Sequence, residues 1–288
     1  MAVALAVPAF ACTPPNETMP LATITDSAAL RIVTYDLTDV AVPTLATLAP
    51  PDLEIGLREG PPEYVFSTLV DAARTERGRI VASDGQSREL RVFDADGVFL
   101  RSFGGPGGGP GEFASAAEVV GHTRDTLFVY DPGNRRVTAF DEAGVVGSTT
   151  TLVSGAGGAP FEVVRLDDGG FVALTRWVDP HAPPDGPHDM RLELDSTVVQ
   201  RFGSDGQVLD TLGIVADRHR ARIVQDAGSG SMRVMQAQPP HTARTFVRTD
   251  GEGVVIGHSA SFGFGFHPGD GAPGTLVRVV GIDHPATA

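Results

Sequence analysis

One block of this sequence recurs 47 residues further along with its internal spacing unchanged. The positions that repeat are Asp84, Phe93, Asp94 and Gly97 in the first copy, and Asp131, Phe140, Asp141 and Gly144 in the second. Short apolar runs with the alternation of half-buried strands stand before each Asp and each Phe. A chain built in this way is expected to fold as a series of similar β units.

Each repeat unit is predicted to hold several strands. The first unit has strand-like runs at Arg79–Ala82 and Leu90–Phe93, the second has them at Leu127–Tyr130 and Arg136–Phe140, and another run follows each Gly. A fixed period of this size with several strands per unit is typical of a β-propeller blade. The chain also has 35 Gly and 22 Pro without a collagen period, which suits many tight turns. The predicted fold class is therefore an all-β propeller of four-stranded antiparallel blades.

Looser copies of the unit continue toward the C-terminus. They comprise a turn and strand at Asp167–Thr175, the Phe-x-x-x-Gly ending at Phe202 and Gly206, and a hairpin within 217–236. A last copy begins at Thr249–Gly257 and finishes with the strand Thr275–Val280. A further strand is predicted at Val65–Ala72, before the first copy. At about 45 residues per blade, residues 50–288 have room for five or six blades. The last predicted strand has no obvious partner that would close the ring. The sequence is therefore also compatible with a propeller that is incomplete at the C-terminus.

The repeated positions have structural roles that follow from their residue types. An Asp at a strand end, as at Asp84 and Asp131, can accept hydrogen bonds from backbone N–H groups of the following turn. Gly97, Gly144 and Gly206 stand where a hairpin loop needs a positive φ. The aromatic rings are expected to pack between neighbouring blades; they belong to Phe93, Phe140 and Phe202.

The second copy, VYDPGNRRVTAFDEAG, resembles the NHL repeat of six-bladed propellers, including those of bacterial envelope proteins. The NHL pattern of Asp, Asn-x-Arg and Phe-Asp-x-x-Gly has Asn134 and Arg136 in place, whereas the first copy carries Ser87 and Glu89 there. The glycine-rich segment Gly104–Phe113 is similar to the connection between NHL blades. The resemblance is strongest over residues 54–150 and weakens after 213. The resemblance implies that one face of the propeller binds a protein or another ligand. Enzymes are a minority among the members of this family.

The N-terminal residues predict export. Residues 1–11 (MAVALAVPAFA) form an apolar run that ends in small residues, which is typical of a signal peptide. Cys12, the only cysteine, follows directly, and this arrangement resembles a bacterial lipoprotein signal whose cysteine becomes lipid-modified. Residues 12–30 are polar and rich in proline, as a flexible tether would be, and 31–288 are assigned to the propeller. The predicted location is the cell envelope, in the periplasm or anchored to the outer membrane.

The strongest candidate for chemistry is an insertion that interrupts the repeat at 177–189. Its candidate binding residues are Trp177, Asp179, His181, Asp185, His188 and Asp189. Imidazoles and carboxylates so close in sequence can hold a divalent metal or accept a basic partner. The Pro-rich spacing does not impose the tetrahedral geometry of a metal site, so no metal ligand, cofactor or catalytic residue is assigned. A second segment, SFGFGFHPG around Phe264, admits two interpretations, an aromatic binding strip or a strand packed in a core, and we favour the strand.

The charge of the chain narrows the range of partners. The net charge of −14 repels phosphate backbones and anionic lipid headgroups, which argues against nucleic-acid binding and leaves a lipid anchor as the membrane contact. The predicted function is non-catalytic: a binding or scaffold propeller that recognises a protein, peptide or glycan through the loops of one face. The alternative is a metal-dependent propeller hydrolase or lyase, similar to the lactonases or amidating lyases.

Overall fold

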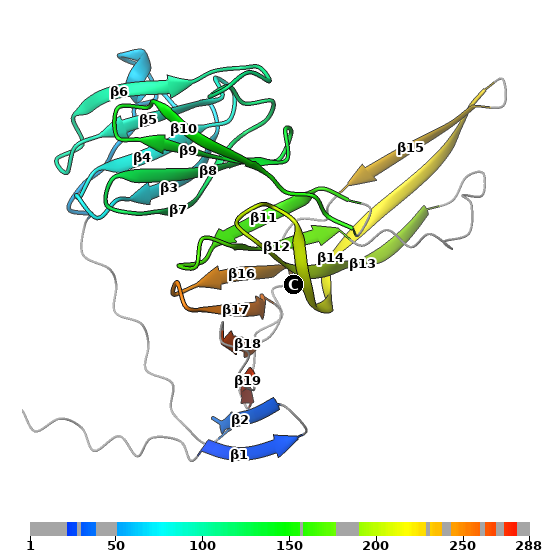
Figure 1. The fold of residues 1–288 in the computed structure, drawn as a ribbon. Helices are drawn as coiled ribbons and strands as arrows, with labels where there is room; N and C mark the ends of the chain where they lie inside the picture. Colours follow the sequence, from blue (N-terminus) through cyan, green and yellow to red (C-terminus); the bar gives the residue numbers. More distant parts are fainter. Residues whose placement is uncertain are drawn as a thin grey trace, which may run out of the picture.

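The structure, a computed structural model, is an all-β propeller in which successive blades follow one another along the chain (Figure 1). It describes residues 22–27, 30–38, 51–155, 158–176, 190–228, 231–237, 243–259, 263–268 and 274–280. The described residues form two four-stranded sheets, one five-stranded sheet and one six-stranded sheet. They supply four of the five or six blades predicted, and the antiparallel four-stranded blade is confirmed as the building unit.

Blades one and two are the two copies of the repeat. Blade one consists of β3 (Leu69–Arg74), β4 (Ile80–Asp84), β5 (Glu89–Phe93) and β6 (Phe99–Gly104). Blade two consists of β7 (Glu118–His122), β8 (Thr126–Asp131), β9 (Arg136–Asp141) and β10 (Val146–Thr151). In both blades the sheet order follows the chain order, as in a meander of antiparallel hairpins.

Blades three and four have additional strands at their outer edges. Blade three consists of β11 (Pro160–Arg165), β12 (Phe171–Arg176), β13 (Met190–Phe202), β14 (Val208–Gly228) and β15 (Ser231–Ala237). Blade four begins with β16 (Thr245–Thr249), β17 (Gly253–His258), β18 (Gly263–Pro268) and β19 (Gly274–Val280). β14 and β15 continue past the rest of their sheet as a long arm (Figure 1).

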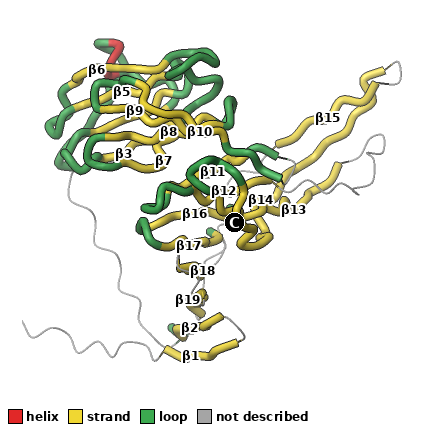
Figure 2. Tube along the Cα trace, in the orientation of Figure 1, coloured by secondary structure: helices red, strands yellow, loops and turns green. Residues whose placement is uncertain are grey.

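An N-terminal hairpin completes the sheet of blade four. It consists of β1 (Ala22–Ser27) and β2 (Leu30–Asp36), and β2 pairs in parallel with β19 from Gly274 opposite Leu30 to Val280 opposite Asp36. Residues 22–27, predicted as part of a tether, are strand here, in keeping with their alternation of Thr with apolar residues. The only helix in the described part of the chain is η1 (Pro62–Tyr64), the short red segment of Figure 2. No described helix is long and apolar enough to cross a membrane.

The predicted strands are present, and their ends are shifted by a few residues. The largest difference is β3, predicted to begin at Val65 and found to begin at Leu69. The residues before it have other partners: the Val65 carbonyl accepts a hydrogen bond from Arg91 Nη1 at 2.7 Å, and the Phe66 ring lies 4.8 Å from the Arg91 guanidinium carbon. Residues 65–68 therefore cover the end of blade one instead of extending its first strand.

The three repeated aromatic residues are fully buried. Phe140, 1% exposed, packs with Val81 and Leu90 of blade one and with Phe113. Phe202, 0% exposed, belongs to a cluster that joins blade three to Tyr130 of blade two. Phe93 is likewise 0% exposed, but it contacts the rings of Tyr64, Phe66 and Phe99, so the segment before blade one covers it.

The repeated Asp residues tie the start of each blade to its second strand. Asp84 accepts hydrogen bonds from the backbone N–H groups of Ser67 and Gln86, and Asp131 accepts them from those of Ala114 and Gly133. Ala114 lies 47 residues after Ser67, so the arrangement repeats with the sequence. Burial opposes the ionisation of Asp131, but these bonds and those from Ser115 and Asn134 hold its pKa below the usual value.

The repeated glycines lie in turns, and the glycine-rich segment connects two blades, as the sequence predicted. Gly97, Gly144 and Gly206 have φ values of +83°, +85° and +80°. The segment Gly104–Phe113 links β6 to β7, and Arg136 holds it by donating to the carbonyls of Gly108, Gly109 and Glu112.

Candidate functional site

The first strands of the blades lie side by side and enclose a polar pocket. β3 contacts β7, β7 contacts β11, and β11 contacts β16. Between them is a pocket of about 560 Å³, which we call the axial pocket. Six charged side chains line it: Asp71, Glu118, Glu162, Arg176, Arg244 and Arg248. Carboxylates and guanidinium groups in one pocket of this size can bind a ligand that carries both charges.

The three carboxylates come from the same place in three successive blades. Asp71 pairs across its sheet with Ser83, Glu118 with Tyr130, and Glu162 with Leu174. Glu118 lies 47 residues after Asp71, and Glu162 lies 44 residues after Glu118. Because the first strands of propeller blades surround the axis, equivalent positions on them converge on one pocket.

Two of the acids are bound by the next blade. Asp71 Oδ2 accepts a hydrogen bond of 2.8 Å from the backbone N–H of Val119 on β7. Glu162 Oε1 accepts one of 3.0 Å from the N–H of Val247 on β16, and a second of 2.7 Å from Arg248 Nη1. Both side chains are therefore held in place as joints between neighbouring blades.

Glu118 differs from the other two acids. Among the residues that the structure describes, its carboxylate has no hydrogen-bond donor. Burial, followed by the negative charges of Asp71 and Glu162, raises its pKa to about 7, while Arg244 and Arg248 act in the opposite direction. Glu118 therefore titrates near neutral pH and is available to a ligand that offers a donor or a positive charge.

The arginines lie at the exposed side of the pocket. Arg248 pairs with Glu162 and lies 5.9 Å from the centroid of the Phe246 ring. Arg176 ends β12 and Arg244 precedes β16, and both are exposed. Neither of these two arginines has a carboxylate within ion-pair distance among the described residues. They can therefore meet the carboxylate of a ligand.

The acids do not form a metal site within the part of the chain that the structure describes. Over those residues, no three His, Cys, Asp or Glu side chains come close enough together to hold a metal ion. No metal ligand was assigned from the sequence. The candidate binding residues of the insertion lie outside the described residues: Trp177, Asp179, His181, Asp185, His188 and Asp189. The same is true of Cys12.

The insertion and the axial pocket are neighbours in the chain. Residue 177 follows directly on Arg176, which lines the pocket. The repeat residues of the sequence analysis, by contrast, lie in the turns, the connector and the cores between blades, away from the pocket lining.

The sequence analysis missed the axial acids, although a signal for two of them was present. Asp71 and Glu118 are separated by the same 47 residues as the repeated Asp, Phe and Gly positions. Extending the repeat by one strand toward the N-terminus would have paired them. Arg244 and Arg248 show no such signal, because blade four repeats the pattern only loosely.

Comparisons with known proteins do not place the chain in a family. No family model and no curated protein matches the sequence. Solved structures that resemble it include a candidate exported protein of Bacteroides fragilis, with 12% identity, a TM-score of 0.43 and coverage of 85% of this chain and 79% of that one. Others are virginiamycin B lyase from Staphylococcus aureus (9% identity, TM-score 0.32, coverage 69% and 80%) and the β-propeller domain of Swd1 from Myceliophteria thermophila (12%, 0.32, coverage 73% and 85%). At these TM-scores the fold assignment rests on the strand order of the chain itself.

Proposed function

We propose that this protein is a non-catalytic binding propeller whose axial pocket takes a peptide segment with a positive and a negative group. The observation that carries the proposal is the convergence of Asp71, Glu118 and Glu162 from three blades, with arginines at the exposed side. The ligand's positive group would meet Glu118, and its carboxylate would meet Arg176 and Arg244. The sequence predicted recognition through the loops of one face. We now propose that the axial pocket is the main binding site.

A peptide fits the pocket better than a glycan or a nucleic acid does. The charged groups of both signs complement the ammonium, guanidinium and carboxylate groups of a peptide, whereas a neutral sugar offers only hydroxyls. The net charge of −14 opposes the approach of a polyanion. The insertion at 177–189 follows Arg176 in the sequence, and we propose that it adds contacts to the same ligand.

The cellular setting is part of the proposal. The apolar run at 1–11 and Cys12 support export and attachment through a lipid on the cysteine. The NHL-like repeat also suits an envelope protein that presents a binding face. Labelling of the expressed full chain with a palmitate analogue, lost in Cys12→Ser, tests the anchor.

Calorimetric titration with trilysine, triaspartate and the dipolar peptide Lys-Ala-Asp tests the binding proposal. We expect Lys-Ala-Asp to bind most tightly, and Arg244→Gln or Glu118→Gln to weaken its binding by about 10- to 100-fold, as the loss of one charge-assisted contact would. Arg58→Gln is the matched control, since Arg58 is exposed and outside the pocket. Equal affinity for all three peptides, or no effect of either pocket variant, would refute the proposal.

A metal-dependent hydrolase or lyase is the second candidate, and Glu118 is the observation that favours it. A carboxyl whose pKa is about 7 suits a general base at neutral pH. Elemental analysis of the purified protein before and after EDTA separates the two functions. A binding propeller should keep its capture of Lys-Ala-Asp after chelation. Tightly held stoichiometric metal, together with a hydrolytic or lyase activity that is lost both on chelation and in Glu118→Gln, would favour the enzyme.

A further inference from the structure

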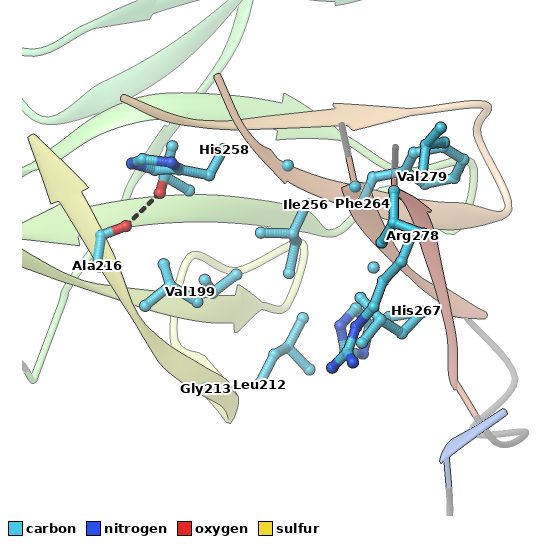
Figure 3. Close-up of a pocket in the computed structure, with 17 residues that line it drawn as sticks. Val199, Leu212, Gly213, Ala216, Ile256, His258, Phe264, His267, Arg278 and Val279 are labelled. Atoms are coloured by element: carbon cyan, nitrogen blue, oxygen red, sulfur yellow. Dashed lines mark hydrogen bonds between the residues drawn. The ribbon is translucent and has the colours of Figure 1, made fainter. Parts of the chain in front are cut away.

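A second and quite different pocket lies between blades three and four. It is a groove of about 590 Å³ formed by β13 and β14 on one side and β17, β18 and β19 on the other (Figure 3). None of its residues belongs to the axial pocket. We call it the inter-blade groove.

The floor of the groove is open because β18 carries glycines there. Gly263 and Gly265 lie opposite Arg278 and Leu276 of β19, so alternate positions of β18 on this face have no side chain. A Cβ added at Gly265 would meet only the His267 ring at 3.4 Å, apart from a backbone oxygen at 3.9 Å. Space that a side chain would otherwise fill is therefore left for a ligand.

The walls of the groove are mostly apolar. They are formed by Val199, Leu212, Val215, Ile256 and Leu276. Residues Gly263–Pro268 of the segment SFGFGFHPG form strand β18, as favoured from the sequence. Phe264 is 41% exposed, and its side chain alternates to the face of β18 opposite Gly263 and Gly265. Phe262 lies outside the described residues.

Polar groups stand at the two ends of the groove. Figure 3 shows Arg278 and His267 at one end and His258 at the other, with Val199, Leu212 and Ile256 between them. His258 Nε2 is bound to the Asp217 carbonyl oxygen at 2.8 Å. Burial lowers the pKa of His267, so its ring is neutral at pH 7. No described residue of the lining is Asp, Glu or Lys, and Arg278 is the one arginine among them.

We propose that the inter-blade groove binds a single-chain amphiphile with a carboxylate head, such as a fatty acid. The alkyl chain would lie over Gly263 and Gly265 against the apolar walls, and the carboxylate would pair with Arg278. The volume is within the range of about 300–1,000 Å³ that is usual for small-ligand sites, and an apolar lining with few polar groups is their usual character. In a chain of net charge −14, an anionic head has a favourable partner only at such a local cation.

Calorimetry with monomeric octanoate, decanoate and dodecanoate tests this assignment on the full chain. Each added pair of methylenes should tighten binding, by at most about 4-fold per methylene, because each buried CH₂ contributes roughly the same free energy. Gly265→Val, which puts a side chain on the floor and suits a strand, should weaken decanoate binding at least about 10-fold.

Arg278→Met separates the head-group contact from the alkyl contact. We expect it to weaken decanoate about 10-fold and to leave decanol unchanged. Circular dichroism of both variants controls for their folding, and Arg58→Gln controls for the loss of an exposed arginine. The absence of decanoate binding, affinity that does not depend on chain length, or binding that survives both variants would overturn the proposal. So would binding to phosphatidylglycerol vesicles without binding of the monomeric acids.

Discussion

Asp84→Asn is expected to lower the free energy of unfolding by about 3–5 kcal/mol, because it leaves the charge of Arg91 buried without its partner. Asp84 Oδ2 lies 3.1 Å from Arg91 Nη2, and the two side chains are only 2% and 9% exposed. Arg91 is also held by the carbonyls of Glu63 and Val65, so it cannot easily turn toward solvent. Urea unfolding followed by circular dichroism measures the loss.

Two further variants show whether burial is the cause. Asp26→Ser breaks the ion pair of Asp26 with Arg31 at 3.2 Å, where the side chains are 67% and 59% exposed, and should change stability by less than about 1 kcal/mol. The double variant Asp84→Asn/Arg91→Met removes the charge that Asp84→Asn leaves unpaired, and should be more stable than that single variant. A loss below about 1 kcal/mol for Asp84→Asn would show that the pair is not shielded from water as the structure places it.

The blade architecture could be read from the sequence because its determinants are local. Gly97 and Gly144 adopt the positive φ that their turns need, and Phe93 and Phe140, 47 residues apart, stand at the same position of the third, buried strand in blades one and two. A residue whose structural role depends only on its own hairpin stands at the same distance from the other repeated residues in each copy of the unit. That regularity makes blades one and two predictable from the sequence.

The axial pocket could not be predicted in the same way, because the side chains that line it come from different blades. Asp71 is bound by Val119, and Glu162 by Val247, which lies 85 residues away in the sequence. Whether such a carboxylate is held or left without a donor depends on the neighbouring blade, and no local pattern contains that information. The pairing of β2 with β19 has the same character, since strands from opposite parts of the chain meet in one sheet.

Glu118→Gln is expected to stabilise the protein at pH 8 and to have little effect at pH 4. Below about pH 4.5 the Glu118 carboxyl is protonated in both the folded and the unfolded chain, so it contributes nothing to the pH dependence. Between 4.5 and about 7 the unfolded chain releases a proton that the folded chain keeps, so stability falls as the pH rises. Above about pH 7 the penalty is complete, at about 2 kcal/mol when the partial exposure of the side chain is allowed for. Gln removes this penalty.

Glu162→Gln is the matched control, since Glu162 occupies the equivalent position of blade three but accepts hydrogen bonds from Val247 and Arg248. Removal of its charge should destabilise the protein at pH 8, by about 1–3 kcal/mol. The two substitutions are chemically identical, and Glu162 has the hydrogen-bond donors that Glu118 lacks among the described residues, so opposite signs at pH 8 are the expected result. Two results would show that the pocket does not oppose the charge of Glu118. One is that Glu118→Gln destabilises the protein at pH 8, and the other is that it changes stability equally at pH 4 and pH 8.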